Sequence, residues 1–275
     1  MDKRRMCPHC RAFISSNDRI CPYCEAEVGP RAVDRRPTGQ IAGFIPHAHF
    51  TTTMILLVNF GLFAATALYS MSSGEGGWID VDGRTLVYFG AKLRAAVLMG
   101  QWWRLLTAGF LHGGLLHILM NSWVLFDLGA QVEEAYGSSR LIVFYIVATF
   151  TGFFASTFWS PAISVGASAG LFGLIGAMIA VGVRYPTSLG AAIRGLYIRW
   201  AVYGLIFGLL PGLAIDNAAH IGGLAGGFGI AYLAGLPAPV RTIGERIWKV
   251  AAWVAVLVTI YCFVQWFMWF RLATA

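Results

Sequence analysis

The chain has 275 residues, of which 57% are hydrophobic and only 12% are charged, and its formal net charge at pH 7 is +7. A soluble domain of this length would carry roughly 25% charged residues, and the mean hydropathy of +0.66 also excludes a soluble globular class. We therefore predict an all-α, multi-pass membrane protein with a small polar N-terminal segment. We interpret the positive charge as a signal of membrane orientation rather than of nucleic-acid binding.

Four of the five cysteines lie near the N-terminus in two CxxC pairs, Cys7-Pro-His-Cys10 and Cys21-Pro-Tyr-Cys24. This spacing is typical of a tetrahedral thiolate zinc site. Residues 1–28 are too few to bury a core, so we expect structural Zn²⁺ to hold them together as a zinc ribbon. Two disulfides are the alternative, which a reducing cytoplasmic location disfavours.

Residues 29–50 are predicted to be a basic linker, because they combine Arg31, Arg35 and Arg36 with prolines and glycines. Such arginines would lie against anionic lipid headgroups. No signal peptide is visible, since the first long apolar run begins near Thr53. We therefore expect the N-terminus to stay in the cytoplasm.

Seven apolar runs are predicted to cross the membrane. They cover about 53–72, 114–131, 140–159, 168–184, 198–213, 218–236 and 247–270. With the N-terminus inside, the later inside loops carry lysines and arginines, whereas the outside loops 160–167 and 211–217 carry none. The positive-inside rule then places the C-terminus outside, and we expect the membrane to be a bacterial inner membrane.

The first outside connection is long, covers residues 73–101 and leads into Gln101-Trp102-Trp103-Arg104. Tryptophans beside an arginine are typical of a segment at headgroup level. We therefore expect the Arg104 side chain to snorkel toward the interface.

Ser168 lies between small residues in Gly166-Ala-Ser168-Ala-Gly170, at the start of an apolar run. His220 starts another apolar run, and both residues lie about 24 Å before the inside ends of their helices at 1.5 Å per residue. In a hydrocarbon core of about 30 Å they would share a level just below the outer face. A serine and a histidine at one depth are a candidate nucleophile and general base; two separately hydrogen-bonded packing residues are the alternative.

No acidic residue is clearly placed to orient His220, because Asp216 belongs to the outer loop or the first helical turn. We therefore favour a dyad over a triad. Phe172, one turn after Ser168, is a candidate to orient the imidazole by stacking.

His117 and Asn121 are four residues apart and share a helix face. They are candidates to stabilise the oxyanion of a tetrahedral intermediate, together with the Ser168 backbone N–H. An interhelical hydrogen-bond network is the alternative. His112 falls before the helix and is expected to brace the outer loop, while Glu133 at an inside helix end is expected to be solvated.

Glycines 223 and 227 are spaced as Gly-x-x-x-Gly on the helix that carries His220, and the Ser168 helix contains Gly170, Gly173 and Gly176. Small residues let membrane helices approach closely. Close packing of these two helices would bring Ser168 and His220 within hydrogen-bond reach.

These elements resemble the rhomboid intramembrane serine proteases. The resemblance rests on Trp103-Arg104, His112…His117-x-x-x-Asn121, Gly166-x-Ser168 and Ala219-His220-x-x-Gly223-x-x-x-Gly227, and it covers roughly residues 100–236. It implies six bundle helices within residues 51–236 and an added C-terminal helix within 237–275. Ala169 is a departure, since many members have glycine directly after the serine.

The resemblance further implies a serine endopeptidase that needs no cofactor for catalysis, with a Ser168–His220 dyad and with His117 and Asn121 in the oxyanion site. It implies a structural role in the first outer loop for Trp103 and Arg104, and a stabilising role near the second helix for Glu133. The expected partners are transmembrane substrates, the bilayer and a cytoplasmic partner of the zinc ribbon; nucleic acid is not expected. The alternative function is an inactive rhomboid-like adaptor that binds transmembrane clients.

Overall fold

The computed structural model describes residues 4–7, 9–15, 18–28, 49–211, 214–237 and 243–273. The chain divides into two compact units, Met1–Pro46 and His47–Ala275. The basic linker predicted over residues 29–50 falls almost wholly outside the described residues.

The small unit is built from two similar turns, each closed around a CxxC pair. Strands β1 (Arg4–Met6) and β2 (Phe13–Ser15) pair in antiparallel fashion. The N–H groups of Cys7 and Cys21 each donate to the carbonyl five residues later. The residue after each second cysteine, Arg11 or Glu25, adopts a positive φ of 62° or 55°. This tight backbone turns all four thiols toward one point.

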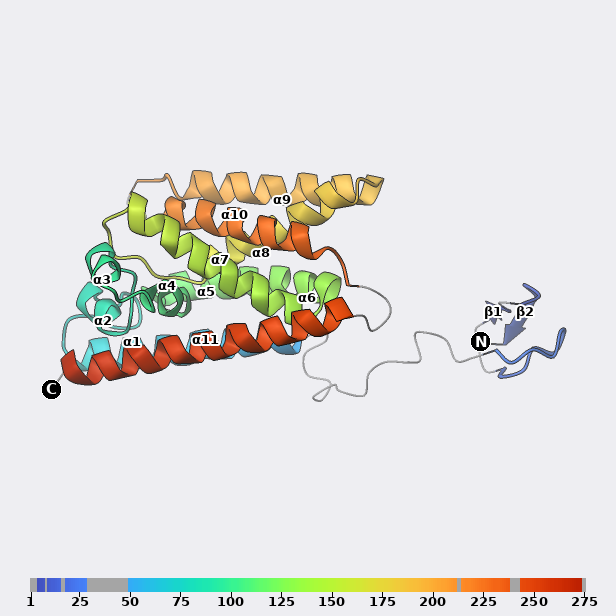
Figure 1. The fold of residues 1–275 in the computed structure, drawn as a ribbon, viewed down its shortest axis with the longest axis horizontal. Helices are drawn as coiled ribbons and strands as arrows, with labels where there is room; N and C mark the ends of the chain where they lie inside the picture. The colour runs from blue at the N-terminus through green and yellow to red at the C-terminus, as the bar shows by residue number, and fades with distance from the viewer. Residues whose placement is uncertain are drawn as a thin grey trace. The chain divides into compact units, whose positions relative to one another are not determined.

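The large unit is helical. Its elements are α1 (Phe50–Ser72), α2 (Gly83–Tyr88), α3 (Arg94–Leu98), α4 (Arg104–Thr107), η2 (Ala108–Phe110), α5 (Leu115–Val124), η3 (Leu125–Gly129), α6 (Ala130–Tyr136), α7 (Ser138–Trp159), α8 (Ser168–Arg184), α9 (Ser188–Phe207), α10 (Asn217–Ala234) and α11 (Ile243–Ala273). Elements α5, η3 and α6 form one continuous rod with a π-helical middle. The predicted all-α membrane fold is confirmed (Figure 1).

Four helical rods of the described chain are long and apolar enough to cross a membrane: Phe50–Ser72, Leu115–Tyr136, Ser138–Trp159 and Ile243–Ala273. Helix α8 is a shorter apolar helix and is almost entirely buried by its neighbours. The chain is therefore an integral, multi-pass membrane protein whose most enclosed helix carries Ser168.

Helix α10 packs tightly between α7 and α8 because its glycines bring the backbones together. A Cβ added to Gly223 would lie 2.1 Å from the carbonyl oxygen of Ala169, and one added to Gly227 would lie 2.1 Å from that of Gly173. No side chain larger than hydrogen fits either contact. The predicted close approach of the two helices is present.

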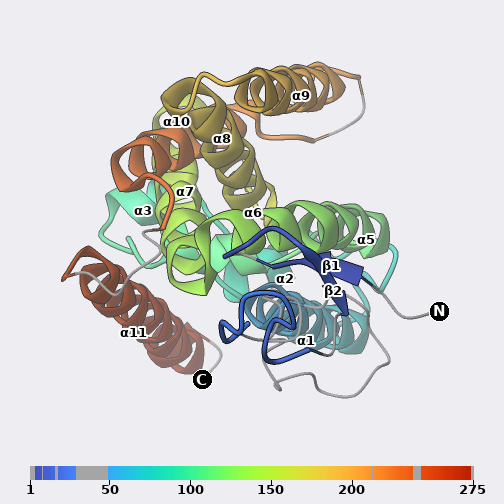
Figure 2. The ribbon, with the colours of Figure 1, turned by 90° about the vertical axis from the view of Figure 1, so that its right-hand side faces the viewer.

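Helix α9 lies at the edge of the bundle, against the side of α8 that faces away from α10 (Figure 2). The prediction of a span over 198–213 is wrong, because the helix begins ten residues earlier, at Ser188, and ends at Phe207. The Thr187 hydroxyl accepts a hydrogen bond from the Gly190 N–H and so caps this earlier start. Arg194 and Arg199 are consequently exposed residues within the helix, where they lower its hydropathy.

The connection between α1 and α5 is folded around a buried arginine, and the prediction that Arg104 snorkels to the interface is wrong. Arg104 is 1% exposed and donates to the carbonyls of Val87 and Ala91 and to the side chain of Gln101. Burial lowers the pKa of Arg104 to about 10, which leaves it charged at neutral pH. The guanidinium therefore ties the short helices α2 and α4 together from inside.

The C-terminal helix α11 joins the bundle at both of its ends. Near its start, Glu245 receives two hydrogen bonds of 2.8 Å from Arg140 of α7. Near its end, the Trp269 ring stacks on Arg104 at 4.6 Å, and Trp266 donates its indole N–H to the carbonyl of Tyr88. The added helix thus fastens the connection between α1 and α5 to α7.

Candidate active site

The Ser168 hydroxyl and the His220 imidazole lie side by side. Ser168 is the first residue of α8, and His220 lies in the first turn of α10. The Oγ–Nε2 distance is 3.0 Å, within hydrogen-bond range. His220 is 6% exposed. A hydroxyl whose proton faces an imidazole nitrogen can be activated as a nucleophile.

The imidazole is held by stacking on Phe172 of α8. The two ring centroids are 4.1 Å apart and the ring planes differ by 11°. Among the described residues, His220 Nδ1 has no hydrogen-bond partner. Asp216 caps α10 by accepting from the Ala219 N–H and also accepts from the Ser156 hydroxyl. Its hydrogen bonds therefore join the start of α10 to α7 and do not reach the imidazole.

His117 approaches the serine from α5. A Cβ placed on Gly166 would lie 2.7 Å from His117 Nε2 and 3.5 Å from Ser168 Oγ, so both polar atoms border the same small space. Gly166 has a φ of +133°, which L side chains rarely adopt. The Gly113 N–H donates to His117 Nδ1 at 3.3 Å. Since Nδ1 accepts, the neutral ring carries its proton on Nε2, which faces this space.

Asn121 and His112 are less directly connected to the serine. The Asn121 amide donates to the carbonyl of His117, one turn earlier, at 2.9 Å. The His112 ring is fully buried and meets the His117 ring edge to face at 5.1 Å between centroids. Neither His112 nitrogen has a hydrogen-bond partner in the described part of the chain. His112 lies before α5, where sequence analysis placed it.

Glu133 is buried and joins three helices, so the expectation that it is solvated is wrong. Its carboxylate accepts from the N–H groups of Thr51 and Thr52 at the start of α1, and from the Thr52 hydroxyl. It also accepts from the Ser138 hydroxyl at the start of α7, at 2.7 Å. A carboxylate at helix N-termini satisfies N–H groups that have no partner in their own helix.

Lys92 is a site-supporting residue that sequence analysis does not single out. Its side chain is fully buried, and its ammonium donates to the carbonyls of Ser160 and Ala162 at 2.7 and 3.1 Å. Its backbone pairs in both directions with Ser164. Lys92 thereby fixes the loop that leads into Ser168. A lysine in a loop sequence gives no signal of this burial, because the partners are backbone carbonyls 68 and 70 residues away.

The four N-terminal thiols form a separate cluster that could hold a metal ion. All four sulfurs lie within 4.8 Å of one another, and His9 is not among them. The Cys10 N–H lowers the pKa of Cys7 to about 6. The pKa of Cys24 is lowered by the Ala26 N–H, but burial and the neighbouring thiols raise it overall to about 12. Four sulfurs this close together are a donor set that suits a divalent cation.

Together, these features define a polytopic membrane protein with a serine–histidine pair enclosed between its helices. A family model described as the Rhomboid domain matches residues 99–237, and the chain belongs to the rhomboid family.

Three relatives illustrate the match. The chain is 39% identical over 174 residues to "Rhomboid protease GluP" of Bacillus subtilis, covering 63% of this chain and 34% of that protein. It is 42% identical over 137 residues to "RHOMBOID-like protein 7" of Arabidopsis thaliana, covering 48% and 43%. It is 31% identical over 216 residues to "RHOMBOID-like protein 5" of the same plant, covering 69% of both chains. The matched stretch thus spans about a third to a half of the first two relatives. Helix α11 and the cysteine cluster lie outside the family match.

Proposed function

We propose that this protein is an intramembrane serine endopeptidase that cleaves transmembrane substrates with a Ser168–His220 dyad. The observation that carries the proposal is the 3.0 Å approach of Ser168 Oγ to His220 Nε2, on a ring fixed by Phe172. The printed name of the Bacillus subtilis relative supports a protease. The reaction needs no cofactor.

In this mechanism, Ser168 Oγ attacks the carbonyl carbon of the scissile peptide bond while His220 Nε2 accepts the hydroxyl proton. The C–N bond then breaks, and the imidazolium returns that proton to the leaving amine. Water hydrolyses the resulting acyl ester, again with His220 as the base. Because no carboxylate contacts Nδ1 among the described residues, we assign orientation of the ring to Phe172.

The negative oxygen of the tetrahedral intermediate would be stabilised by His117 and by the Ser168 N–H. The proton on His117 Nε2 supports this role, since it faces the space beside Ser168 Oγ. The Ser168 N–H lies at the N-terminus of α8, where the helix dipole favours negative charge. We assign Asn121 as a further donor that would turn from the His117 carbonyl toward the oxyanion.

The predicted substrate is a single-span protein whose helix unwinds near its outer end, because an intact helix shields its peptide bonds from attack. Small and helix-breaking residues near the scissile bond are the expected preference. The distribution of lysine and arginine supports an orientation with the N-terminus in the cytoplasm and the C-terminus outside. We place the protein in a bacterial inner membrane.

The test is cleavage of a single-span substrate in proteoliposomes, together with labelling by a fluorophosphonate. Ser168→Ala and His220→Ala are expected to abolish both signals. Ser188→Ala is the matched control, because Ser188 lies at the far end of the bundle, on α9, and this variant should behave as wild type. Cleavage retained by Ser168→Ala would end the proposal. Client binding by a wild-type protein that is neither labelled nor active would instead favour the adaptor.

We also propose that the cysteine cluster binds structural Zn²⁺ and recruits a cytoplasmic partner. A tetrahedral site with zinc–sulfur bonds of about 2.3 Å places its sulfurs about 3.8 Å apart. The Cys7–Cys24 and Cys10–Cys21 pairs lie at 3.8 and 3.6 Å, which supports this metal. Residues 1–28, 29–50, 51–236 and 237–275 would then be the ribbon, linker, catalytic bundle and added helix.

A further inference from the structure

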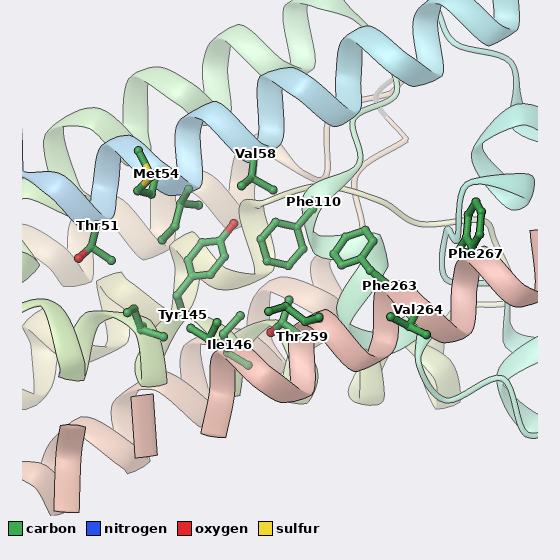
Figure 3. Close-up of a pocket in the computed structure, with 14 residues that line it drawn as sticks. Thr51, Met54, Val58, Phe110, Tyr145, Ile146, Thr259, Phe263, Val264 and Phe267 are labelled. Carbon is green, nitrogen blue, oxygen red and sulfur yellow. The ribbon is translucent and has the colours of Figure 1, made fainter. Parts of the chain in front are cut away.

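An apolar groove runs between α1 and α11, with α7 as its floor (Figure 3). Its volume is about 570 Å³. Met54 and Val58 line it from α1, Tyr145 and Ile146 from α7, and Ile260 and Phe263 from α11. The groove lies away from Ser168, and the proposed reaction does not use it.

All three walls of this groove are helices long and apolar enough to cross a membrane. Two of the three hydroxyls in the lining are already used within the protein: the Thr259 hydroxyl donates to the Ala255 carbonyl, and the Tyr145 hydroxyl donates to the Gly109 carbonyl. The groove therefore offers hydrocarbon contacts to its occupant, at a depth where the surrounding medium is lipid chains.

The size of the groove selects the kind of occupant. A membrane-spanning helix about 10 Å wide and 30 Å long fills roughly 2,400 Å³, several times the volume available. A single lipid acyl chain of about 16 to 18 carbons has the size of a ligand that fills a pocket of about 300–1,000 Å³. A chain of this kind fits within the groove, whereas a whole substrate or partner helix could only pack over its open side.

Charge next to the groove indicates the headgroup. Lys249 is exposed and precedes the groove residue Val256 by seven positions, so it lies on the same face of α11, about 10 Å closer to the helix start. The nearby Glu245 is paired with Arg140. An acyl chain in the groove would therefore place a phosphate near an ammonium that can receive it.

We propose that the groove between α1, α7 and α11 binds one acyl chain of an anionic phospholipid, whose headgroup contacts Lys249. Between its two ends, α11 buries few of its own side chains against the bundle, among them Ala252 and Cys262. The bound lipid would fill the gap between α11 and α1 and stabilise the added helix on the catalytic bundle.

The experiment uses the full chain in proteoliposomes containing phosphatidylglycerol with a photoreactive diazirine in its acyl chain. After irradiation, the crosslinked peptides are mapped by mass spectrometry. The expected crosslinks concentrate on the groove-facing residues of α1, α7 and α11. Uniform crosslinking around the whole perimeter of the bundle would mean annular lipid only and would overturn the proposal.

Two substitutions on one helix provide the matched comparison. Ile260 lines the groove and Val254 does not, yet their exposed fractions are 54% and 53%. Ile260→Trp should lower groove crosslinking by about tenfold, because the indole excludes several methylene groups, whereas Val254→Trp should leave it unchanged. Val58→Trp, from the opposite wall, should repeat the loss. Wild-type crosslinking in both groove variants would refute the site.

The headgroup assignment has its own measurement. Lys249→Gln should remove the preference for phosphatidylglycerol over phosphatidylcholine probes while groove crosslinking persists. An unchanged preference would overturn the contact with Lys249. Because none of these measurements involves cleavage, their results are independent of the proposed protease activity.

Discussion

Replacing Gly223 by alanine should separate the two halves of the proposed dyad without altering either residue. Gly223 follows His220 by three positions on α10, and the carbonyl that it meets belongs to Ala169, the residue after Ser168. The contact between these backbones therefore sets the distance between the imidazole and the hydroxyl.

The size of the effect follows from the distances. The new Cβ would lie 2.1 Å from the Ala169 oxygen, whereas ordinary contact begins at 3.4 Å. The helices must then move apart by roughly 1 Å, since close-packed interiors leave no free space. The same movement would stretch the 3.0 Å dyad distance beyond hydrogen-bond range. A misplacement of about 1 Å costs about 100-fold in rate, and overpacking costs about 1–3 kcal/mol of stability.

The assay compares the cleavage rate and the fluorophosphonate labelling rate of Gly223→Ala with those of Gly229→Ala. Gly229 lies on the same helix, and a Cβ there would meet nothing within 4 Å, so this control should be as active as wild type. Thermal unfolding of both variants confirms that each remains folded. The reasoning is refuted if Gly223→Ala cleaves at the wild-type rate, or if Gly229→Ala is impaired to the same extent.

Three further substitutions test the supporting structure. Lys92→Met removes the ammonium that donates to two loop carbonyls. Amide hydrogen exchange should therefore accelerate in residues 160–166 but not in α7. Unchanged exchange in that loop would contradict the assigned contact. Glu133→Gln places an amide donor among groups that themselves donate. It should lower the free energy of unfolding by about 1–3 kcal/mol. Thermal stability equal to that of wild type would contradict this prediction. Cys24→Ser should abolish the one bound zinc per chain expected by metal analysis, and retention of a full equivalent would exclude the four-thiolate site.

The membrane class and the candidate chemistry could be predicted from local sequence. Hydropathy predicts apolar helices because the bilayer requires every spanning backbone to satisfy its own hydrogen bonds. The two CxxC pairs predict a cluster because their spacing is short enough to fix the geometry locally. Gly223 and Gly227 predict close packing since only glycine allows the backbones to touch.

The predictions failed where a charged side chain is satisfied by distant backbone. Arg104 was expected at the headgroups, yet three acceptors and two tryptophan rings enclose it. Position at a helix end predicted a solvated Glu133, and only the family resemblance implied a stabilising role; the carboxylate caps α1 and contacts the start of α7. Burial of a charge is favourable only when its partners are already arranged around it, and residue type and spacing do not reveal those partners.

Composition, helical periodicity and short motifs alone were enough to establish a helical membrane protein with a serine, a histidine and a four-cysteine module, because these properties depend on residues close together in the chain. The 3.0 Å approach of Ser168 to His220, the stacking of Trp269 on Arg104, the burial of Lys92, and the groove beside α11 depend on contacts between residues dozens of positions apart. Such contacts exist only once the helices have packed, since packing fixes which faces meet and at what separation.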